Sequence, residues 1–472
     1  MKLALVNTVR ANLRNSQSPL GLAYIATYLR EFMGFNNIRI IDGNTEDILP
    51  EIVKFRPDIA GISSMTMAHG YANELASEIK ERLGIPLIYG GVHISTLPSS
   101  LSRSFDIGVI GEGEETMLEL VRSLEEHEPE KASLEKIKGI VYWKGGQLEY
   151  TERRPLIEPL DRIPIPDRDF LSRDYFRPMT SFDGDTHIEG NILTGRGCPY
   201  RCRFCSTSVF WDRVRLHSAQ RVCDEIRTLV DGNGVDSILI WDDLFTISKK
   251  RTRDIADILK KEGITDRVIF SAQARANLIN DDICEILNSM NVKSVGFGFE
   301  SGSQKVLDYL KCGSVTVEQN KNAILTCKKH GLKVTGSLMF GNPGETLDDM
   351  KETLELIDFM GQNGADLIWT FVTKPLPGTE FWEIAKSRGK VSDDMDWTIL
   401  EQTDDANPLM LDDSISKQEF RKIMEDARSR AFVYFRTGKF KYPLSFLIKH
   451  AIQRPDRVPR VLAKLVRTKL GG

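Results

Sequence analysis

The chain has 472 residues, enough for about three domains. Apolar residues make up 41% and charged residues 28%, fractions that are typical of a folded protein and exclude a disordered or fibrous one. The net charge of -4 argues against a whole-chain electrostatic interaction with nucleic acid. Apolar runs fall short of the roughly 18 residues that cross a bilayer, and the first residues, MKLALVN, are too short an apolar stretch for a signal peptide. We therefore expect a cytoplasmic protein that does not bind nucleic acid.

Short apolar strands alternate with helical patterns over residues 1–125. Strands are expected at 2–7, 38–42, 58–63, 86–89 and 106–110, and helices at 20–31, 45–54, 70–83 and 114–124. The alternation predicts an α/β domain, doubly wound and Rossmann-like, with a parallel sheet. Ligands of such sheets bind beyond the carboxyl ends of the strands. The candidate binding residues at those ends are Ser63, Ser64, Gly90, Gly91, Gly111 and Glu112.

The rest of the chain divides into three parts. Residues 126–189 combine a charged stretch, a hairpin around Gly145-Gly146 and several prolines, and so predict a linker with a β-hairpin. Residues 190–385 repeat strand and helix patterns six times, which predicts a partial (β/α)6 barrel with its chemistry at the strand C-termini. Residues 386–472 predict a helical C-terminal region with a basic tail.

Three of the seven cysteines, Cys198, Cys202 and Cys205, lie in one short loop after the first predicted barrel strand. Three thiolates can hold three irons of a four-iron, four-sulfur (4Fe-4S) cluster, and the fourth iron is then open to a small-molecule ligand. Zinc is the alternative, but zinc sites use a second ligand pair, and none is visible. The odd cysteine count argues against a disulfide scaffold. Cys223, Cys284, Cys312 and Cys327 lie in or beside helical patterns and are expected to be packing residues, although Cys312, in a loop, could be a reactive thiol.

The spacing C-x3-C-x-aromatic-C, with Phe204 before the third cysteine, resembles the radical S-adenosylmethionine (SAM) superfamily. The resemblance covers residues 190–385 and implies that the cluster binds SAM and cleaves it to a 5'-deoxyadenosyl radical. It also implies SAM contacts at successive strand ends. Asp242 and Asp243 would bind the ammonium group, although a helix N-cap would account for one of them. Arg275 would bind the carboxylate, Glu300 and Ser301 the ribose and methionyl part, and Gly341 and Pro343 the adenine.

Residues 1–125 resemble the cobalamin-binding domain that is fused to one radical SAM subfamily. This resemblance rests on four short sequence motifs, Ser18-Pro-Leu-Gly-Leu-Ala-Tyr, Ser63-Ser-Met-Thr66, Gly90-Gly-Val-His93 and Ile110-Gly-Glu-Gly-Glu-Glu115. The D-x-H-x-x-G motif, whose His ligates cobalt, is absent, so cobalamin would bind without that ligand. His69 is a candidate ligand, but a helix-start His is more often exposed, and His93 is expected in a loop near the nucleotide tail. The alternative is a purely structural domain. A methylthiotransferase is excluded because this domain has no cysteine.

Together the two resemblances imply a cobalamin-dependent enzyme that abstracts hydrogen from an unactivated carbon, most often for C-methylation. Oxidative or ring-forming chemistry with the same cofactors is the alternative. A non-enzymatic iron-sulfur electron carrier fits less well, because a cluster held by three cysteines leaves one iron open. A cobalamin sensor fits less well, because the full set of SAM-binding motifs is present. A reducing partner such as flavodoxin or ferredoxin is implied.

From Ala431 onward the chain has ten Lys and Arg residues and one acidic residue. Apolar residues are interleaved with these charges, and basic amphipathic segments can lie on anionic membrane surfaces. The tail therefore allows a peripheral membrane contact and a lipid-like substrate. The alternative is a helix packed on the acidic remainder of the chain.

Overall fold

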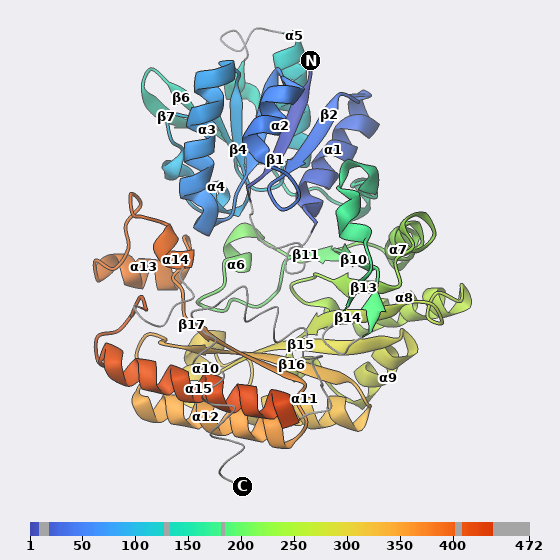
Figure 1. The fold of residues 1–472 in the computed structure, drawn as a ribbon, viewed down its shortest axis with the longest axis vertical. Coiled ribbons are helices and arrows are strands. Elements are labelled where there is room, and N and C mark those ends of the chain that lie inside the picture. The colour runs from blue at the N-terminus through green and yellow to red at the C-terminus, as the bar shows by residue number, and fades with distance from the viewer. Residues whose placement is uncertain (9–17, 127–132, 181–184, 402–407, 438–472) are drawn as a thin grey trace.

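Two parallel sheets, one in each half of the chain, form the two main bodies of the protein, and the N-terminal one lies above the other in Figure 1. The structure is a computed structural model that describes residues 1–8, 18–126, 133–180, 185–401 and 408–437. The carboxyl ends of the N-terminal strands face the second body, so the ligand edge of the first sheet lies at the boundary between the two.

The N-terminal domain is doubly wound, as the alternating pattern predicts. Its five parallel strands follow the order β2-β1-β3-β4-β5, with helices on both faces of the sheet. Buried aliphatic residues on both faces of β1 explain why its sequence is a continuous apolar run. The elements are β1 Leu3–Asn7, α1 Leu20–Met33, β2 Ile38–Asp42, α2 Ile48–Phe55, β3 Ile59–Ser63, α3 His69–Leu83, β4 Leu87–Gly90, α4 Val92–Thr96, β5 Ile107–Val109 and α5 Glu114–Glu126.

The predicted hairpin forms, but it belongs to the N-terminal sheet and not to a free linker. β6 (Ile140–Lys144) pairs antiparallel with β5, and β7 (Gln147–Tyr150) pairs with β6. Ile140 and Val141 are fully buried, so the hairpin covers an edge of the sheet that would otherwise expose unpaired backbone groups. Beyond it, residues 151–178 carry only short 3-10 turns.

The second body is an open barrel of six parallel strands in sequential order, which confirms the partial (β/α)6 prediction. Helices lie on its outer, convex side. A two-stranded ribbon, β11 with β12, lies beyond the first strand. The elements are β10 Glu189–Ile192, β11 Gly195–Arg196, α6 Thr207–Phe210, β12 Arg215–Leu216, α7 Ala219–Asn233, β13 Ser237–Ile240, α8 Lys249–Lys261, β14 Ile269–Ala274, α9 Asp281–Ser289, β15 Val292–Glu300, α10 Gln304–Lys311, α11 Val317–Lys329, β16 Lys333–Phe340, α12 Leu347–Gln362 and β17 Leu367–Val372.

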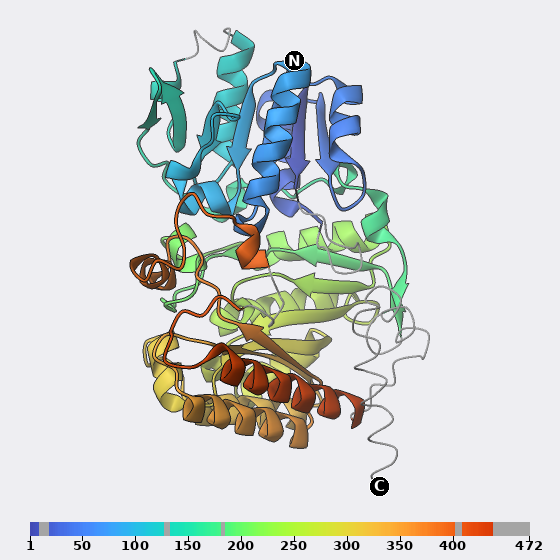
Figure 2. The same cartoon turned by 60° about the vertical axis from the view of Figure 1, so that its left-hand side comes forward.

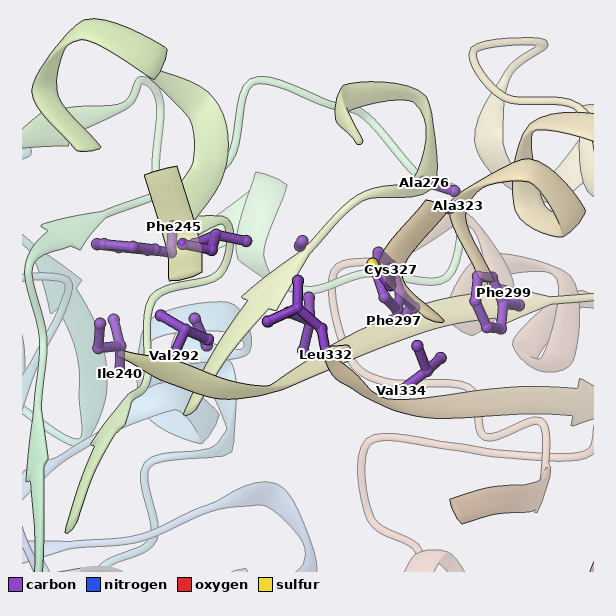
Figure 3. Packing of buried hydrophobic residues seen from close by; sticks show 14 of the residues in the cluster. Ile240, Phe245, Ala276, Val292, Phe297, Phe299, Ala323, Cys327, Leu332 and Val334 are labelled. Atoms are coloured by element: carbon purple, nitrogen blue, oxygen red, sulfur yellow. The ribbon is translucent and has the colours of Figure 1, made fainter. Parts of the chain in front are cut away.

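The barrel core lies between the strands and the outer helices. Ile240, Val292 and Val334 point from the strands into this core, and Cys327 reaches it from α11 (Figure 3). Along β13, β14 and β16 buried residues alternate with half-buried ones, because successive side chains of a strand point to opposite faces. The half-buried residues therefore face the concave side. Cys223, Cys284 and Cys327 are buried, as packing residues should be, whereas Cys312 is exposed.

The C-terminal region is helical as far as the structure describes it. α13 (Glu380–Ser387) and α14 (Thr398–Glu401) lie beside the boundary between the domains, and α15 (Lys417–Thr437) packs on α12 and β17 (Figure 2). The basic tail after residue 437 lies outside the described residues. Within the described ranges, no helix combines the length and the apolarity that a membrane span requires.

Candidate active site

The cysteine loop is held between β11 and α6 by the β11–β12 ribbon. Arg196 pairs with Arg215 across the ribbon, immediately before the loop begins. Gly197 has φ +93°, and a Cβ there would lie 2.7 Å from the carbonyl oxygen of Arg213, so only glycine allows this close approach. Within the loop, Cys205 N–H donates to the Cys202 carbonyl at 3.1 Å. The ribbon and this turn therefore present the loop at the strand C-termini.

The three thiols lie close enough to affect one another's ionisation. Burial raises the pKa of Cys198, and the charges of Asp243, Cys202 and Cys205 act in the same direction. Burial also raises the pKa of Cys205. Within the described ranges, no three His, Cys, Asp or Glu side chains are grouped tightly enough for a single metal ion. Thiolates that oppose one another's ionisation are stabilised by the positive charge of bound iron, which is what cluster binding would supply.

Arg275 follows β14 and reaches the cysteine loop. Its Nη1 lies 3.5 Å from Cys202 Sγ, its Nη2 donates to the Ser314 hydroxyl at 2.5 Å, and its guanidinium lies 3.8 Å from the centre of the Tyr200 ring. A buried cation beside a thiolate stabilises the negative charge that cluster binding requires. In this structure the residue predicted for the SAM carboxylate thus contacts a cluster cysteine.

The two neighbouring carboxylates after β13 face opposite ways. Asp242 is buried and accepts hydrogen bonds from the Thr194 N–H at 2.6 Å and from the Thr194 hydroxyl. Burial raises its pKa to about 6. Asp243 lines the cavity between the domains and accepts from the Thr207 hydroxyl at 2.9 Å, next to the cysteine loop. Only Asp243 is therefore placed to meet a cation beside the cluster, whereas Asp242 ties β13 to the chain after β10.

At the end of β15, Glu300 is held by its neighbours and Ser301 is buried. Glu300 has φ +65°, an uncommon conformation for a side chain with a Cβ. Its carboxylate lies over Gly298, 2.1 Å from where a Cβ would be, and Lys311 Nζ lies 3.3 Å from its Oε1. Ser301 hydroxyl is 3.1 Å from that of Thr353 on α12. Glu300 thus belongs to the concave side, and Ser301 joins the strand end to a helix.

The stretch after β16 forms a closed turn. Glu345 Oε2 accepts from the N–H groups of Gly341 at 2.7 Å and Asn342 at 2.9 Å, while its buried Oε1 has no partner. Burial raises the Glu345 pKa to about 7. A Cβ on Gly341 would approach Phe420 of α15 to 3.2 Å. Neither Gly341 nor Pro343 lines the cavity between the domains.

A cavity of about 340 Å³ joins the ends of the N-terminal strands to the start of the barrel. A Cβ on Gly91 would lie 2.5 Å from the Ser64 carbonyl oxygen, whereas one on Gly111 would meet open space. Gly91 thus allows the ends of β3 and β4 to pack closely, while Gly111 leaves bare backbone at the cavity, where a bulky corrin ligand would approach. The predicted residues that line the cavity are Ser63, Gly90, Gly91, Gly111, Glu112 and Asp243, and Ser64 does not.

The cavity also has lining residues to which the sequence analysis assigned no role. Among them are Arg196, Trp211 and Trp241 from the barrel side and Tyr24 from α1. The sequence offered a hint that Arg196 belongs to the site, because it is a charged residue between two glycines directly before Cys198. Trp241 directly precedes the Asp242-Asp243 pair, and its exposure marks the same strand end.

A buried ionic network joins the two domains beside this cavity. Glu112, from the loop after β5, accepts from Arg215 Nη1 at 2.9 Å and Nη2 at 3.0 Å, from Arg196, and from the Ile157 N–H at 2.9 Å. Arg196 also donates to Glu114. Burial alone would raise the Glu112 pKa, but the two guanidiniums and these hydrogen bonds lower it below its usual range. Glu112 is thus an interdomain anion next to the cysteine loop.

The two histidines of the N-terminal domain are buried, so the expectations that His69 is exposed and that His93 lies in a loop are wrong; His93 belongs to α4. His69 Nδ1 lies 2.8 Å from the Tyr89 hydroxyl, and its ring stacks 4.0 Å from that of His93. Trp397 covers the pair, 4.6 Å from His93. Burial lowers the pKa of His69 to about 4 and that of His93 to about 3, so both are neutral. Neither lines the cavity.

Phe204, the aromatic residue of the cysteine motif, connects the loop to this covering segment. It packs against an apolar cluster that contains Phe381, Trp382 and Trp397. Met67 and Leu97 of the N-terminal domain pack on the same cluster. The cysteine loop, the C-terminal region and the first domain therefore share one apolar contact.

Comparison with known proteins agrees with this geometry. The Radical SAM superfamily matches residues 192–357, and the B12 binding domain matches residues 6–121. The chain is 34% identical over 421 residues to an uncharacterized methyltransferase of Pyrococcus horikoshii, covering 87% of this chain and 86% of that protein. The chain belongs to the cobalamin-binding radical SAM family. As a member of this family it is an enzyme with a 4Fe-4S cluster, SAM and cobalamin as cofactors, of the methyltransferase-like type.

More distant members share most of the chain. The anaerobic magnesium-protoporphyrin IX monomethyl ester cyclase of Rubrivivax gelatinosus is 26% identical over 458 residues, covering 93% of this chain and 79% of that protein. The hopanoid C-3 methylase of Methylococcus capsulatus is 25% identical over 378 residues, covering 77% and 68%. The radical SAM methyltransferase TsrM from Kitasatospora setae, solved with cobalamin and a 4Fe-4S cluster, has the same fold, with a TM-score of 0.69, 20% identity and coverage of 83% and 76%.

Replacing Glu112 should loosen the domain boundary of this radical SAM enzyme. Glu112→Gln leaves the buried Arg215 guanidinium without its anion and Arg196 with Glu114 alone, which costs about 3–5 kcal/mol of unfolding free energy. Because the Glu112 pKa is lowered on folding, its contribution is complete at neutral pH and is lost as the pH falls below about 4. Calorimetric unfolding of both proteins at pH 7 and near pH 4 measures this. Glu152→Gln, which breaks the exposed pair with Lys138, is the control and should cost under about 1 kcal/mol. Equal effects of the two substitutions would contradict the prediction.

Asp242 and Asp243 should respond differently to the same substitution. Asp243→Asn removes a charge from the cavity beside the cluster and should weaken SAM binding about tenfold or more, since a hydrogen bond to a charged group contributes roughly 1.5–3 kcal/mol. Asp242→Asn keeps an acceptor for Thr194 N–H and should leave SAM affinity within about twofold. Isothermal titration of SAM into the reconstituted enzyme measures both. A larger loss in the Asp242 variant would reverse these assignments.

Proposed function

We propose that this enzyme transfers a methyl group to an unactivated carbon of a small-molecule substrate. The observation that supports this most directly is the single cavity lined by Gly91 and Gly111 of the cobalamin-type domain and by Trp241 and Asp243 of the barrel. When bound, the cofactors supply a hydrogen-abstracting agent and a methyl donor. One cavity reached from both domains allows both to act on one carbon, because reaction requires the reacting atoms to lie a few ångströms apart.

The residues of the chain have separate tasks in this proposal. Cys198, Cys202 and Cys205 hold the cluster, and Arg275, 3.5 Å from Cys202, stabilises the thiolate charge. Asp243 binds the SAM ammonium group. Glu300, held over Gly298 by Lys311, faces the concave side, where it can accept hydrogen bonds from the ribose.

Water exclusion is the task of the domain boundary. Glu112, Arg196 and Arg215 are buried there, and Tyr24 and Trp211 lie within 5.3 Å of the guanidinium carbons of Arg196 and Arg215, respectively. A paired and covered ionic network keeps the two halves of the cavity together without admitting solvent. Reactive species formed inside are thereby protected from water. At the first sheet, the strand-end glycines and Ser63 would contact cobalamin, with no ligand from a D-x-H-x-x-G motif.

Anaerobic reconstitution with iron, sulfide and cobalamin tests the proposal. The wild type should bind one cluster and about one corrin, and with SAM and an extract of small molecules it should yield S-adenosylhomocysteine, 5'-deoxyadenosine and a product that carries label from methyl-labelled SAM.

The triple variant C198A/C202A/C205A should lose both the absorbance of the cluster and the cleavage of SAM. Cys312→Ala is the control: it changes an exposed cysteine that contacts the Arg201 carbonyl, and it should retain both properties. 5'-Deoxyadenosine with an unmethylated, ring-closed product would favour the cyclase alternative, and a cluster without corrin would make the first domain structural.

We also propose that the enzyme acts in the cytoplasm, receives electrons from a flavodoxin or ferredoxin, and reaches anionic membrane surfaces through its basic tail.

Replacing Arg454, Arg457 and Arg460 by Gln should weaken association with phosphatidylserine vesicles about a hundredfold, since each basic residue contributes about 1 kcal/mol. Vesicle sedimentation measures this, with neutral phosphatidylcholine vesicles for comparison. Lys250→Gln, an exposed lysine of α8, is the control and should change nothing. Unchanged binding of the triple variant would favour a tail packed on the protein.

A further inference from the structure

Two aromatic side chains stand exposed on the last strand of the barrel. Trp369 and Phe371 of β17 are 46% and 49% exposed, although the strand belongs to a covered sheet. The alternate residues Ile368 and Val372 pack in the core beneath α12 and α15. Successive side chains of a strand point to opposite faces, so Trp369 and Phe371 face the concave side of the barrel. Exposed large aromatic residues on an interior face indicate a binding surface.

The neighbouring strands extend this surface with progressively smaller groups. Trp369 lies beside Ser337 of β16, and Phe371 beside Met339. Ser337 in turn lies beside Gly298 of β15, which has no side chain. The wall is therefore apolar at β17, whereas at β15 the Glu300 carboxylate lies over Gly298. Across the sheet, Trp241, which is 41% exposed, stands at the end of β13, so an indole flanks each side of the concave face.

The wall is uncharged. β16 from Thr335 to Phe340 and the whole of β17 contain no acidic or basic residue. Two basic groups of the barrel are already engaged, Arg275 with Cys202 and Ser314, and Lys311 with Glu300 and the Gly298 carbonyl. A charged substrate group placed against β17 would lose its hydration without a counter-ion, which is costly. An uncharged ring system would instead bury apolar area against Trp369 and Phe371.

We propose that Trp369, Phe371 and Met339 bind a flat, uncharged aromatic or polycyclic part of the substrate, and that Ser337 orients it by a hydrogen bond. This inference rests on the proposed function, since it names the substrate class of the same site. The wall lies on the concave side of the barrel, the side on which the strand ends carry the cysteine loop and Asp243. α15, which ends the described chain, packs on the opposite face of β17.

The uncharged dye N-phenyl-1-naphthylamine and its sulfonated analogue 1-anilinonaphthalene-8-sulfonate are a matched pair of probes. The reconstituted full-length enzyme should bind the uncharged dye with at least about tenfold higher affinity. Trp369→Ala and Phe371→Ala should each weaken its binding about tenfold, and Trp369→Phe should retain most of it. Phe32→Ala, which removes an exposed aromatic ring of α1, should leave it unchanged. Fluorescence titration measures the affinities, and cluster absorbance with circular dichroism verifies that each variant is folded.

Equal binding of both dyes, or no effect of the β17 substitutions, would overturn the inference. Removal of residues 438–472 provides a further test: a gain of dye binding that depends on Trp369 would show that the tail occupies the wall, and would also overturn it. SAM cleavage and methyl transfer by the wild type are measured on the same preparation. Absent methyl transfer with Trp369-dependent dye binding would refute the proposed function alone, whereas methyl transfer without such binding would refute only the substrate class.

Discussion

The buried contact of Glu112 with Arg196 and Arg215 is the constraint on which the rest of the structure depends. Two guanidiniums taken out of water need anions. Glu112 of the other domain pairs with both, and Glu114 pairs with Arg196 as well. Because Arg196 directly precedes the loop that begins after Gly197, this pairing places the ligand edge of the first sheet against the cysteine loop. The glycine-lined strand ends consequently share one cavity with Trp241 and Asp243 of the barrel, and Asp243 contacts Thr207 just after the cysteine loop.

Within the barrel, the alternation of side chains across each strand divides structure from chemistry. Residues that face outward pack on helices, as Ile240 and Val334 do, and the residues that face inward include the polar Ser337 and the aromatic Trp369. The same division separates two adjacent carboxylates. Asp242 turns back to Thr194 and stabilises the strand end, while Asp243 turns to the cavity. It also separates Trp369 from Ile368 on β17, and so leaves an uncharged aromatic wall opposite the side on which α15 packs.

The C-terminal region completes the site from outside the two sheets. Trp397 covers the His69–His93 pair of the first domain, and its apolar cluster extends to Phe204 in the cysteine motif. Both histidines are consequently neutral, and they serve packing in this structure. The contact gives the motif aromatic residue a physical role here, because it joins the cluster loop to the segment that bridges both domains.

The local order of strands and helices and the spacing of Cys198, Cys202 and Cys205 are properties of the sequence itself. Periodicity and thiol spacing act over a few residues, so these features could be predicted, and both sheets confirm the strand predictions. Contacts between distant segments could not. Only the tertiary structure decided four features: the pairing of Glu112 with Arg196, the covering of His93 by Trp397, the joining of the hairpin to β5, and the turn of Asp242 toward Thr194. Buried charges need counter-ions, and apolar surfaces need to be covered, and their partners often come from distant parts of the chain. A short-range sequence pattern does not indicate which distant residue that partner is.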